Sequence, residues 1–161
     1  MRHQNPLSRL AFDRVLVVVP PHGSYIASGR KKALVKSRRY HMEDCALLVV
    51  EQKKAIAILR VARPEKISFS GFKRRRARHL VSEDERRRWW AGKRVFYFYP
   101  VSSVHRLPKP IPVNYPRGPQ VFVRKAQLRY RRAREEKAVK RRRRGTNAAR
   151  RKKGSPRKRR A

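Results

Sequence analysis

The sequence predicts a fold that is mainly β with short helices, an α+β domain built on a small β-barrel and followed by a basic tail. Short runs of β-branched and aliphatic residues recur through the first 123 positions, as they do in strands. The segments between these runs carry proline, glycine or a helix-capping pattern, so any helices there are short. From Arg124 onward, Lys and Arg dominate and little is left to bury.

These observations divide a chain of 161 residues into one folded domain with two extensions. We expect an N-terminal arm over residues 1–13, the domain over 14–123 and an Arg/Lys-rich tail over 124–161. Within the tail, residues 124–144 contain good helix formers but repel one another. We therefore expect partial helix that forms on a polyanion, and disorder from Gly145 onward.

The first half of the domain reads as strand, short helix and strand, followed by a hairpin. Residues 14–19, RVLVVV, predict a buried strand that two prolines end. Residues 24–28 predict one or two helical turns with Ser24 as the cap and Gly29 after the end. A second strand is expected over 32–38. The apolar runs 45–50 and 55–63 are separated by the polar EQKK, which predicts a hairpin.

The second half combines a basic stretch, a short helix and an aromatic strand. Ser82 and Glu85 form a capping-box pattern, which predicts a helix over 82–90. Residues 93–101 alternate aromatic side chains on both faces, of which a small barrel would bury only one. Five prolines between residues 107 and 119 predict an extended segment that pairs only at a sheet edge, and QVFV at 120–123 closes the sheet.

Charge identifies the class of partner. The chain has 47 Lys and Arg against 10 Asp and Glu, a formal net charge of +37. The tail holds 20 basic and 2 acidic residues and is about three times as charge-dense as the rest. A polyphosphate releases counterions for each phosphate that is neutralised, so RNA or DNA is the expected partner. An anionic membrane surface is a weaker alternative, because the basic stretches lack a wide apolar face.

Other classes of protein are excluded by what the sequence lacks. The one cysteine, Cys45, forms no internal disulfide or CxxC zinc site, and we expect it to be a small buried apolar residue. The longest apolar run is too short to cross a bilayer, and the N-terminus lacks the apolar centre of a signal peptide. We expect no metal or cofactor. The expected location is intracellular, in cytoplasm, nucleoid or nucleus, or inside a virus particle.

One segment carries a more specific pattern, YIASGRKKALVKSR at residues 25–38, supported by AIAILRVARPEKIS at 55–68. With the order of elements over 14–123, it resembles the ASCH domains of the PUA-like superfamily. The resemblance implies a small β-barrel associated with RNA binding and, in some members, with RNA cleavage or hydrolysis of a modified nucleoside. It also favours RNA over DNA as the ligand.

The resemblance further assigns roles along the motif. The family places a lysine two residues after the glycine, an acid about five after it and an arginine about seven after it. Here Gly29 is followed by Lys31, Leu34 and Lys36 at those positions. Leucine cannot act as a general acid or base, so the chain is expected to bind RNA without cleaving it. An enzyme would need an acid from elsewhere, such as Glu43, Asp44 or Glu51.

The candidate nucleic-acid-binding residues are cations and two aromatic side chains that could stack on bases. They are Lys31, Lys32, Lys36, Arg38, Arg39, Lys73, Arg74, Arg75, Arg76, Trp90, Tyr97, Arg141, Arg142, Arg143 and Arg144. The alternative for the first cations is a solvated strand edge. At least one of Trp89 and Trp90 is expected in the core, and His41 is expected to be a surface or packed histidine with no ligand role. A protein that packages nucleic acid, or a ribonucleoprotein subunit, fits the same composition.

Overall fold

The computed structural model describes residues 5–116 and 121–131. The chain divides into two compact units, residues 1–130 and 131–161, and the fold below is that of the first. In chain order its elements are η1 (Pro6–Arg9), β1 (Arg14–Val18), α1 (His22–Ala27), β2 (Ala33–Lys36), β3 (Leu47–Glu51), β4 (Lys54–Val61), β5 (Glu65–Ser68), α2 (Phe69–Arg74), α3 (Arg76–His79), α4 (Glu83–Trp90), β6 (Val95–Asn114), β7 (Phe122–Arg124), η2 (Lys125–Gln127) and β8 (Arg129–Tyr130).

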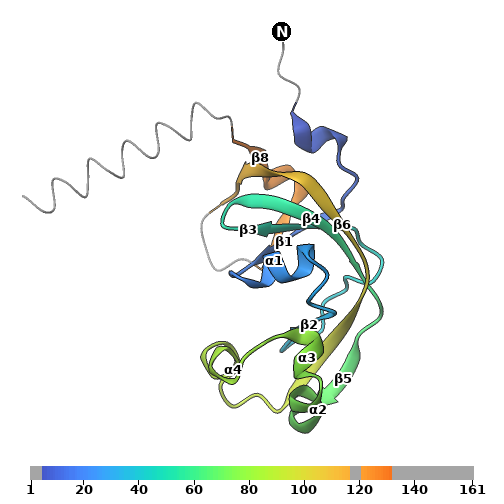
Figure 1. The fold of residues 1–161 in the computed structure, drawn as a ribbon, viewed down its shortest axis with the longest axis vertical. Coiled ribbons are helices and arrows are strands. Elements are labelled where there is room, and N and C mark those ends of the chain that lie inside the picture. Colours follow the sequence, from blue (N-terminus) through green and yellow to red (C-terminus); the bar gives the residue numbers. More distant parts are fainter. Residues whose placement is uncertain (1–4, 117–120, 132–161) are drawn as a thin grey trace, which may run out of the picture. The chain divides into compact units, whose positions relative to one another are not determined.

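The strands form one curled mixed sheet in the order β2-β6-β4-β3-β1-β7, with β5 and β8 also paired to β6 (Figure 1). β1 and β3 are parallel, and all other pairs are antiparallel. The 20-residue strand β6 pairs with β2 and β5 through residues 95–100 and with β4 and β8 through residues 101–114. It therefore joins β2 and β5 to the rest of the sheet.

The predicted hairpin is confirmed. β3 and β4 are joined at Gln52 and Lys53, which both have positive φ values of 48° and 60°, as a two-residue hairpin turn requires. Side chains alternate between the two faces of β3, so Leu47 and Val49 lie in one core cluster and Leu48 and Val50 lie in another. The sheet therefore buries apolar side chains on both faces near its centre.

A third cluster lies where the short helices pack on β2, β5 and the first half of β6. Phe72 from α2 contacts Phe96 at 4.8 Å between ring centroids. The predicted helix over 82–90 is confirmed as α4, with the Ser82–Glu85 capping box present. The basic stretch after β5 is helical, forming α2 and α3.

The first helix differs from the prediction in how it begins. α1 starts at His22, and Ser24 does not cap it. Glu51, at the end of β3, accepts hydrogen bonds from the N–H groups of Gly23 and Ser24 and from the Ser24 hydroxyl. A carboxylate from another strand thus does the capping, which local sequence could not reveal.

Gly23 permits this arrangement because α1 sits very close to β1 and β3. A Cβ atom at position 23 would lie 2.8 Å from Glu51 Cβ and 2.9 Å from Val18 Cγ2. Real Cβ atoms do not approach so closely. The glycine therefore fixes the position of α1, and with it that of His22.

The aromatic strand and the proline segment form one strand, β6. Phe96, Phe98 and Tyr99 are all buried, so the expectation that only one face would be covered is wrong. The helices cover one face, and the loop before β3 covers the other: the Tyr99 hydroxyl donates to the carbonyl of Tyr40 at 3.0 Å. The proline segment is extended as expected, with a register shift against β4 between the Ala57–Arg106 and Ala55–Ile111 pairs.

The folded body extends beyond the boundaries expected at residues 14 and 123. Leu7 and Phe12 before β1, and Leu128 after β7, are buried in one cluster with Val15 and Val123. β7 pairs with β1, as expected for the closing strand. Cys45 is partly exposed and not buried. The helix expected over 124–144 does not begin where predicted, since residues 124–130 form the end of β7, η2 and β8. The rest of that helix and the disorder expected from Gly145 onward lie outside the described residues.

Candidate nucleic-acid interface

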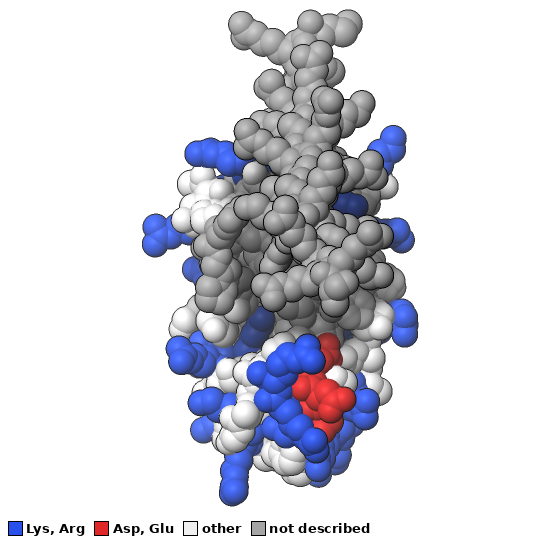
Figure 2. All heavy atoms as spheres, turned by 90° about the vertical axis from the view of Figure 1, so that its left-hand side faces the viewer, with Lys and Arg blue, Asp and Glu red and all other residues white. Residues whose placement is uncertain are grey.

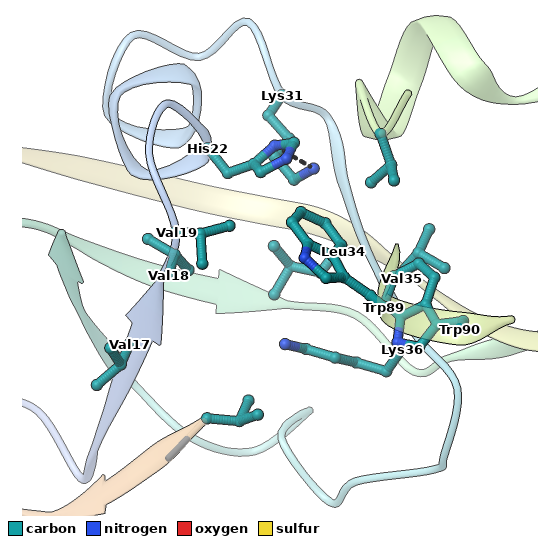
Figure 3. Close-up of a pocket in the computed structure, with 12 residues that line it drawn as sticks. Val17, Val18, Val19, His22, Lys31, Leu34, Val35, Lys36, Trp89 and Trp90 are labelled. Carbon is teal, nitrogen blue, oxygen red and sulfur yellow. Dashed lines mark hydrogen bonds between the residues drawn. The ribbon is translucent and has the colours of Figure 1, made fainter. Parts of the chain in front are cut away.

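A cavity of about 630 Å³ opens between the end of β1, α1, β2 and α4 (Figure 3). It is lined by Val17, Val18, Val19, His22, Lys31, Leu34, Val35, Lys36, Val81, Trp89, Trp90 and Val121. The walls are mainly apolar, and the titratable residues among those that line the cavity are Lys31, Lys36 and His22. Such a volume and such walls are typical of a small-molecule or nucleotide site.

The turn after α1 places Lys31 at this cavity. Gly29 has a φ of 72°, a value that glycine adopts without strain. The Lys31 N–H then donates to the carbonyl of Tyr25, and β2 begins two residues later. Lys31 is 4% exposed, whereas Lys36, at the far end of β2, is only partly buried. Both lysines line the cavity beside the first helix, and their contact with a phosphate there stays a prediction.

Lys31 is held by a chain of polar contacts. Its Nζ lies 3.3 Å from His22 Nδ1 and donates to the main-chain carbonyl of His79. On the other side of the ring, His22 Nε2 lies 3.0 Å from Glu85 Oε1. A neutral His22 that donates from Nε2 and accepts at Nδ1 satisfies both contacts. The Glu85–His22–Lys31 chain therefore connects α4 through α1 to the cavity.

Glu85 is fixed because it also closes the capping box of α4. Its carboxylate accepts the N–H of Ser82 at 2.8 Å, and its own N–H donates to the Ser82 hydroxyl. Burial acts to raise the pKa of Glu85, but the hydrogen bond from Ser82 and the nearby His22 outweigh it and lower that pKa. Glu85 is thus an ionised carboxylate at neutral pH.

His79 binds the Lys31 amine through its main-chain carbonyl, and its own imidazole ring is neutral. Its Nε2 lies 2.9 Å from the carbonyl of Phe72, and its Nδ1 accepts the N–H of Val81 at 3.1 Å. Burial is the main cause that lowers the pKa of His79 to about 4. These two contacts fix the ring, and the carbonyl of the same residue receives Lys31.

Burial makes both lysine amines easier to deprotonate. It lowers the pKa of Lys31 to about 7, with a further contribution from the charge of Lys36, and it lowers the pKa of Lys36 to about 8. His22 also has a lowered pKa, first through burial and then through the charge of Lys31. An anion that enters the cavity would reverse this effect by stabilising the charged amines.

Two indoles form the α4 side of the cavity. Trp89 meets His22 edge-on at 5.6 Å between ring centroids, and Trp90 packs on Phe96 at 5.6 Å. Figure 3 shows the Trp89 ring between the Lys31–His22 pair and the Lys36 side chain, which extends across the cavity. Both indoles are only partly buried, so each has a face to offer a ligand. The chain contains no other tryptophan.

Other predicted binding residues lie outside the cavity. Lys32, Arg38, Arg39 and Arg74 are exposed, and Arg39 pairs with Glu43 at 3.4 Å. Tyr97 lies opposite Lys36 on the neighbouring strand and is partly buried in the core.

The remaining predicted residues belong to the helical end or to the tail. Arg75 pairs with Glu65 and lies over the Phe98 ring at 4.8 Å, so it stabilises the fold. Lys73 and Arg76 line a separate, smaller cavity. The predicted tail residues, Arg141 to Arg144, lie outside the described residues.

Sequence reasoning missed three polar residues of the site, His22, His79 and Glu85. His22 and Glu85 are 63 positions apart, and no spacing rule joins them. The capping box was visible at Ser82 and Glu85, but it predicted only the helix.

None of the three acids proposed for an enzyme contacts Lys31: Glu51 caps α1, Glu43 binds Arg39, and Asp44 is exposed. His41, expected at the surface or packed, is exposed.

The body carries positive charge widely. Figure 2 shows Lys and Arg over the face on view, with a small acidic patch in the half that carries α4. Glu83, Asp84 and Glu85 begin that helix.

Within residues 5–116 and 121–131, no group of three or more His, Cys, Asp or Glu could hold a metal ion. No helix in that part is long and apolar enough to cross a membrane.

Solved structures with the same arrangement of strands and helices carry the name ASCH. The ASCH protein of Zymomonas mobilis is 16% identical, with a TM-score of 0.55 over 78% of this chain and 92% of that one. Two mutant forms of that protein give TM-scores of 0.56 and 0.58 at 16% and 15% identity. This chain has the fold of an ASCH domain. In sequence, no family model and no curated protein matches it.

Lys31, Leu34 and Lys36 of the sequence motif all line the cavity. Leu34, at the position where the family motif carries an acid, is 4% exposed and lines the cavity beside the two lysines. The wall that would carry a carboxylate is therefore apolar here. The carboxylate nearest to Lys31 in the hydrogen-bond chain is that of Glu85, one histidine away.

Proposed function

We propose that this protein binds single-stranded RNA by taking one unstacked nucleotide into the ASCH cavity, and that the basic tail adds affinity for the phosphate backbone. The observation that carries the proposal is the combination of two lysine amines with two indoles in one cavity of about 630 Å³. Nucleotides present an anionic phosphate and an aromatic base, and this cavity has a partner for each.

The indoles supply the stacking surface. A base that stacks on an aromatic side chain contributes about 1–3 kcal/mol in single-stranded recognition. Trp90 is already braced against Phe96, so its ring is fixed before a ligand arrives. A fixed ring loses little conformational entropy on binding.

The lysines supply the phosphate contact. Among the described residues, neither Lys31 nor Lys36 forms an ion pair with a carboxylate. The Lys36 amine forms no hydrogen bond with the described part of the chain, so a phosphate would meet this amine directly. An amine whose pKa is lowered by burial gains most when an anion neutralises its charge. Binding should therefore take up protons near pH 8.

The test uses the two tryptophans as reporters that only the cavity contains. The full chain is titrated with a short oligouridylate and with its deoxy counterpart, and tryptophan fluorescence is followed. The proposal expects a saturable change, with tighter binding of the RNA, because a 2′-hydroxyl gives a protein the means to distinguish RNA from DNA. A mobility-shift assay could detect RNA binding while tryptophan fluorescence stays constant. In that case the cavity is not the site, and the protein packages nucleic acid through charge.

A second candidate function is hydrolysis of RNA or of a modified nucleoside. The Glu85–His22–Lys31 chain favours it, since an amine with a pKa of about 7 is suited to act as a general base at neutral pH. Incubation with mixed RNA, followed by mass spectrometry of the nucleosides and fragments, tests it. New products that disappear in Lys31→Met would establish the enzyme; unchanged RNA would leave the binding role.

A further inference from the structure

A second cavity, of about 330 Å³, lies at the helical end of the body. It is lined by Phe72, Lys73, Arg76, Val81, Glu83 and Arg87. Lys73, Arg76 and Arg87 are exposed, and they come from three different helices. Three cations from separate elements thus converge on one small hollow.

The one acid of this cavity is already neutralised from outside it. Arg86, which does not line the cavity, donates from Nε to both carboxylate oxygens of Glu83 at 3.0 and 2.9 Å, and from Nη2 at 2.6 Å. Arg87 Nε lies farther away, 3.4 Å from the same carboxylate, and its side chain is 70% exposed. The three lining cations therefore leave an excess of positive charge.

The rim of the cavity is held by stacking. Phe69 has Lys73 Nζ 4.5 Å from its ring centroid and the Arg86 guanidinium 4.8 Å from it. Cations stacked on an aromatic ring lose part of their freedom. Lys73 and the Arg86–Glu83 pair are thus positioned relative to each other before any ligand binds.

Val81 lines both cavities. The chain reaches it through Leu80, which has a φ of 54° at the end of α3, a left-handed conformation that a branched side chain rarely adopts. The Val81 N–H is bound by His79 Nδ1, and the His79 carbonyl is bound by Lys31. The wall between the cavities is therefore fixed to the same residues that position the site lysine.

We propose that the second cavity binds the phosphate of the nucleotide next to the one held between the lysines and the indoles, so that single-stranded RNA crosses the body at Val81. This rests on the proposed function for the first cavity. Arginine forks match the geometry of phosphate oxygens, and a small cationic hollow beside a nucleotide-sized one fits a phosphodiester chain.

The experiment compares two ligands that differ by one nucleotide. The full chain is titrated with uridine 5′-monophosphate and with the dinucleotide pUpU, and affinity is read from tryptophan fluorescence. The dinucleotide should bind at least about tenfold more tightly, as expected for an added charged hydrogen-bonded contact. In the double variant Arg76→Ala with Arg87→Ala, this advantage should disappear while affinity for the monophosphate is unchanged.

The matched control removes the same charge elsewhere. Arg60 and Arg106 are exposed arginines on β4 and β6 and line neither cavity, so Arg60→Ala with Arg106→Ala should keep the tenfold advantage. Equal loss in the control would overturn the second site, because general charge would then explain the effect. So would a dinucleotide advantage that persists in the Arg76 and Arg87 variant.

A second readout separates this proposal from the first. With pUpU, the arginine Nε–H signals of Arg76 and Arg87 should shift in NMR spectra together with the tryptophan indole signals. Indole shifts without arginine shifts would overturn the second site and leave the proposed function standing. Arginine shifts without indole shifts would support a phosphate site and contradict the nucleotide in the first cavity.

Discussion

At the scale of single residues, the site depends on an amine placed where water is scarce. Lys36 extends across an apolar cavity, and burial lowers its pKa from 10.5 to about 8. Nothing in the local structure of β2 requires a lysine at its end to lie in a cavity, since exposed positions are available nearby. The neighbouring Lys66 shows the difference: it also lies opposite Tyr97, on the other side of β6, yet it is exposed.

We predict that Lys36→Met stabilises the free protein near neutral pH. Because the folded-state pKa is lowered, the unfolded chain binds more protons between about pH 8 and pH 10.5, and the stability of the original chain rises with pH across that window. The variant should be more stable by about 1–2 kcal/mol at about pH 7, a figure reduced for partial exposure, and this advantage should shrink by about pH 10. Chemical denaturation at both pH values measures it.

Lys66→Met is the control for this prediction, since an exposed substitution changes stability by no more than about 0.5 kcal/mol. If Lys36→Met is destabilising at neutral pH, the amine has a stabilising partner, and the description of the cavity is wrong.

The Glu85–His22 pair positions Lys31, and Glu85→Gln tests it. Glutamine keeps an oxygen for the Ser82 N–H but removes the negative charge that raises the pKa of Lys31. We predict an unchanged fold and an oligouridylate affinity that is weaker by about 1 kcal/mol at neutral pH, with the loss recovered at lower pH as Lys31 becomes protonated. A loss that is the same at every pH would mean that the carboxylate acts through structure alone.

The sequence predicted the lysines of the site but not the residues that hold them. The spacing after Gly29 placed Lys31 and Lys36 on a cleft wall, because a glycine turn and a short strand fix side chains locally. His22, His79 and Glu85 meet only after the sheet has curled, and such long-range contacts leave no local pattern. Trp90 was expected at the site, and the same helix also brings Trp89 there.

At the scale of elements, the cavity exists because α1 lies tightly against the end of β1 and β3. Glu51 binds the first N–H groups of α1, and Gly23 lets the backbones approach. His22 and the turn to Lys31 are carried by this helix. The hairpin and α4 could be predicted because their signals are local, whereas the cap of α1 comes from a residue 28 positions away.

We predict that Gly23→Ala destabilises the fold by about 1–3 kcal/mol, the usual cost of overpacking. The added methyl would contact Glu51 Cβ and Val18 Cγ2 at impossible distances, so α1 must move outward. Thermal denaturation gives the loss, and tryptophan fluorescence should shift because His22 contacts Trp89. Ser28→Ala, at the exposed end of the same helix, is the control. A Gly23→Ala protein as stable as the original would show that α1 is loosely placed.

At the scale of the whole molecule, we propose separate tasks for the folded body and the basic tail, and the boundary between them lies later than the sequence suggested. Leu128 is 7% exposed in the core, and Tyr130 pairs with Val113. The change in charge at Arg124 marks where the basic segment begins, but it does not mark where the folded body ends. A few apolar residues within the basic segment still pack in the core.

We predict that a chain ending at Arg131 folds as stably as the full chain, whereas one ending at Val123 loses about 2–3 kcal/mol. The second truncation removes a buried leucine, which alone is worth about 1.5–3 kcal/mol, and the β8 pairing. Urea denaturation compares them. Binding of single-stranded RNA by the Arg131 chain should show a shallower salt dependence, by about 0.7 in log–log slope for each phosphate that the tail neutralises. Equal stability of both truncated chains would restore the earlier boundary.

The central claim is that the cavity recognises a nucleotide and that general positive charge does not suffice. It is tested most directly by titrating pUpU into the full chain, Lys36→Met and Lys66→Met, with tryptophan fluorescence as the readout. Each variant loses one positive charge beside Tyr97, but only Lys36 lines the cavity. We predict that Lys36→Met weakens binding by at least about tenfold, as expected for a lost charged contact, and that Lys66→Met leaves it nearly unchanged. Equal affinities for both variants would contradict the account.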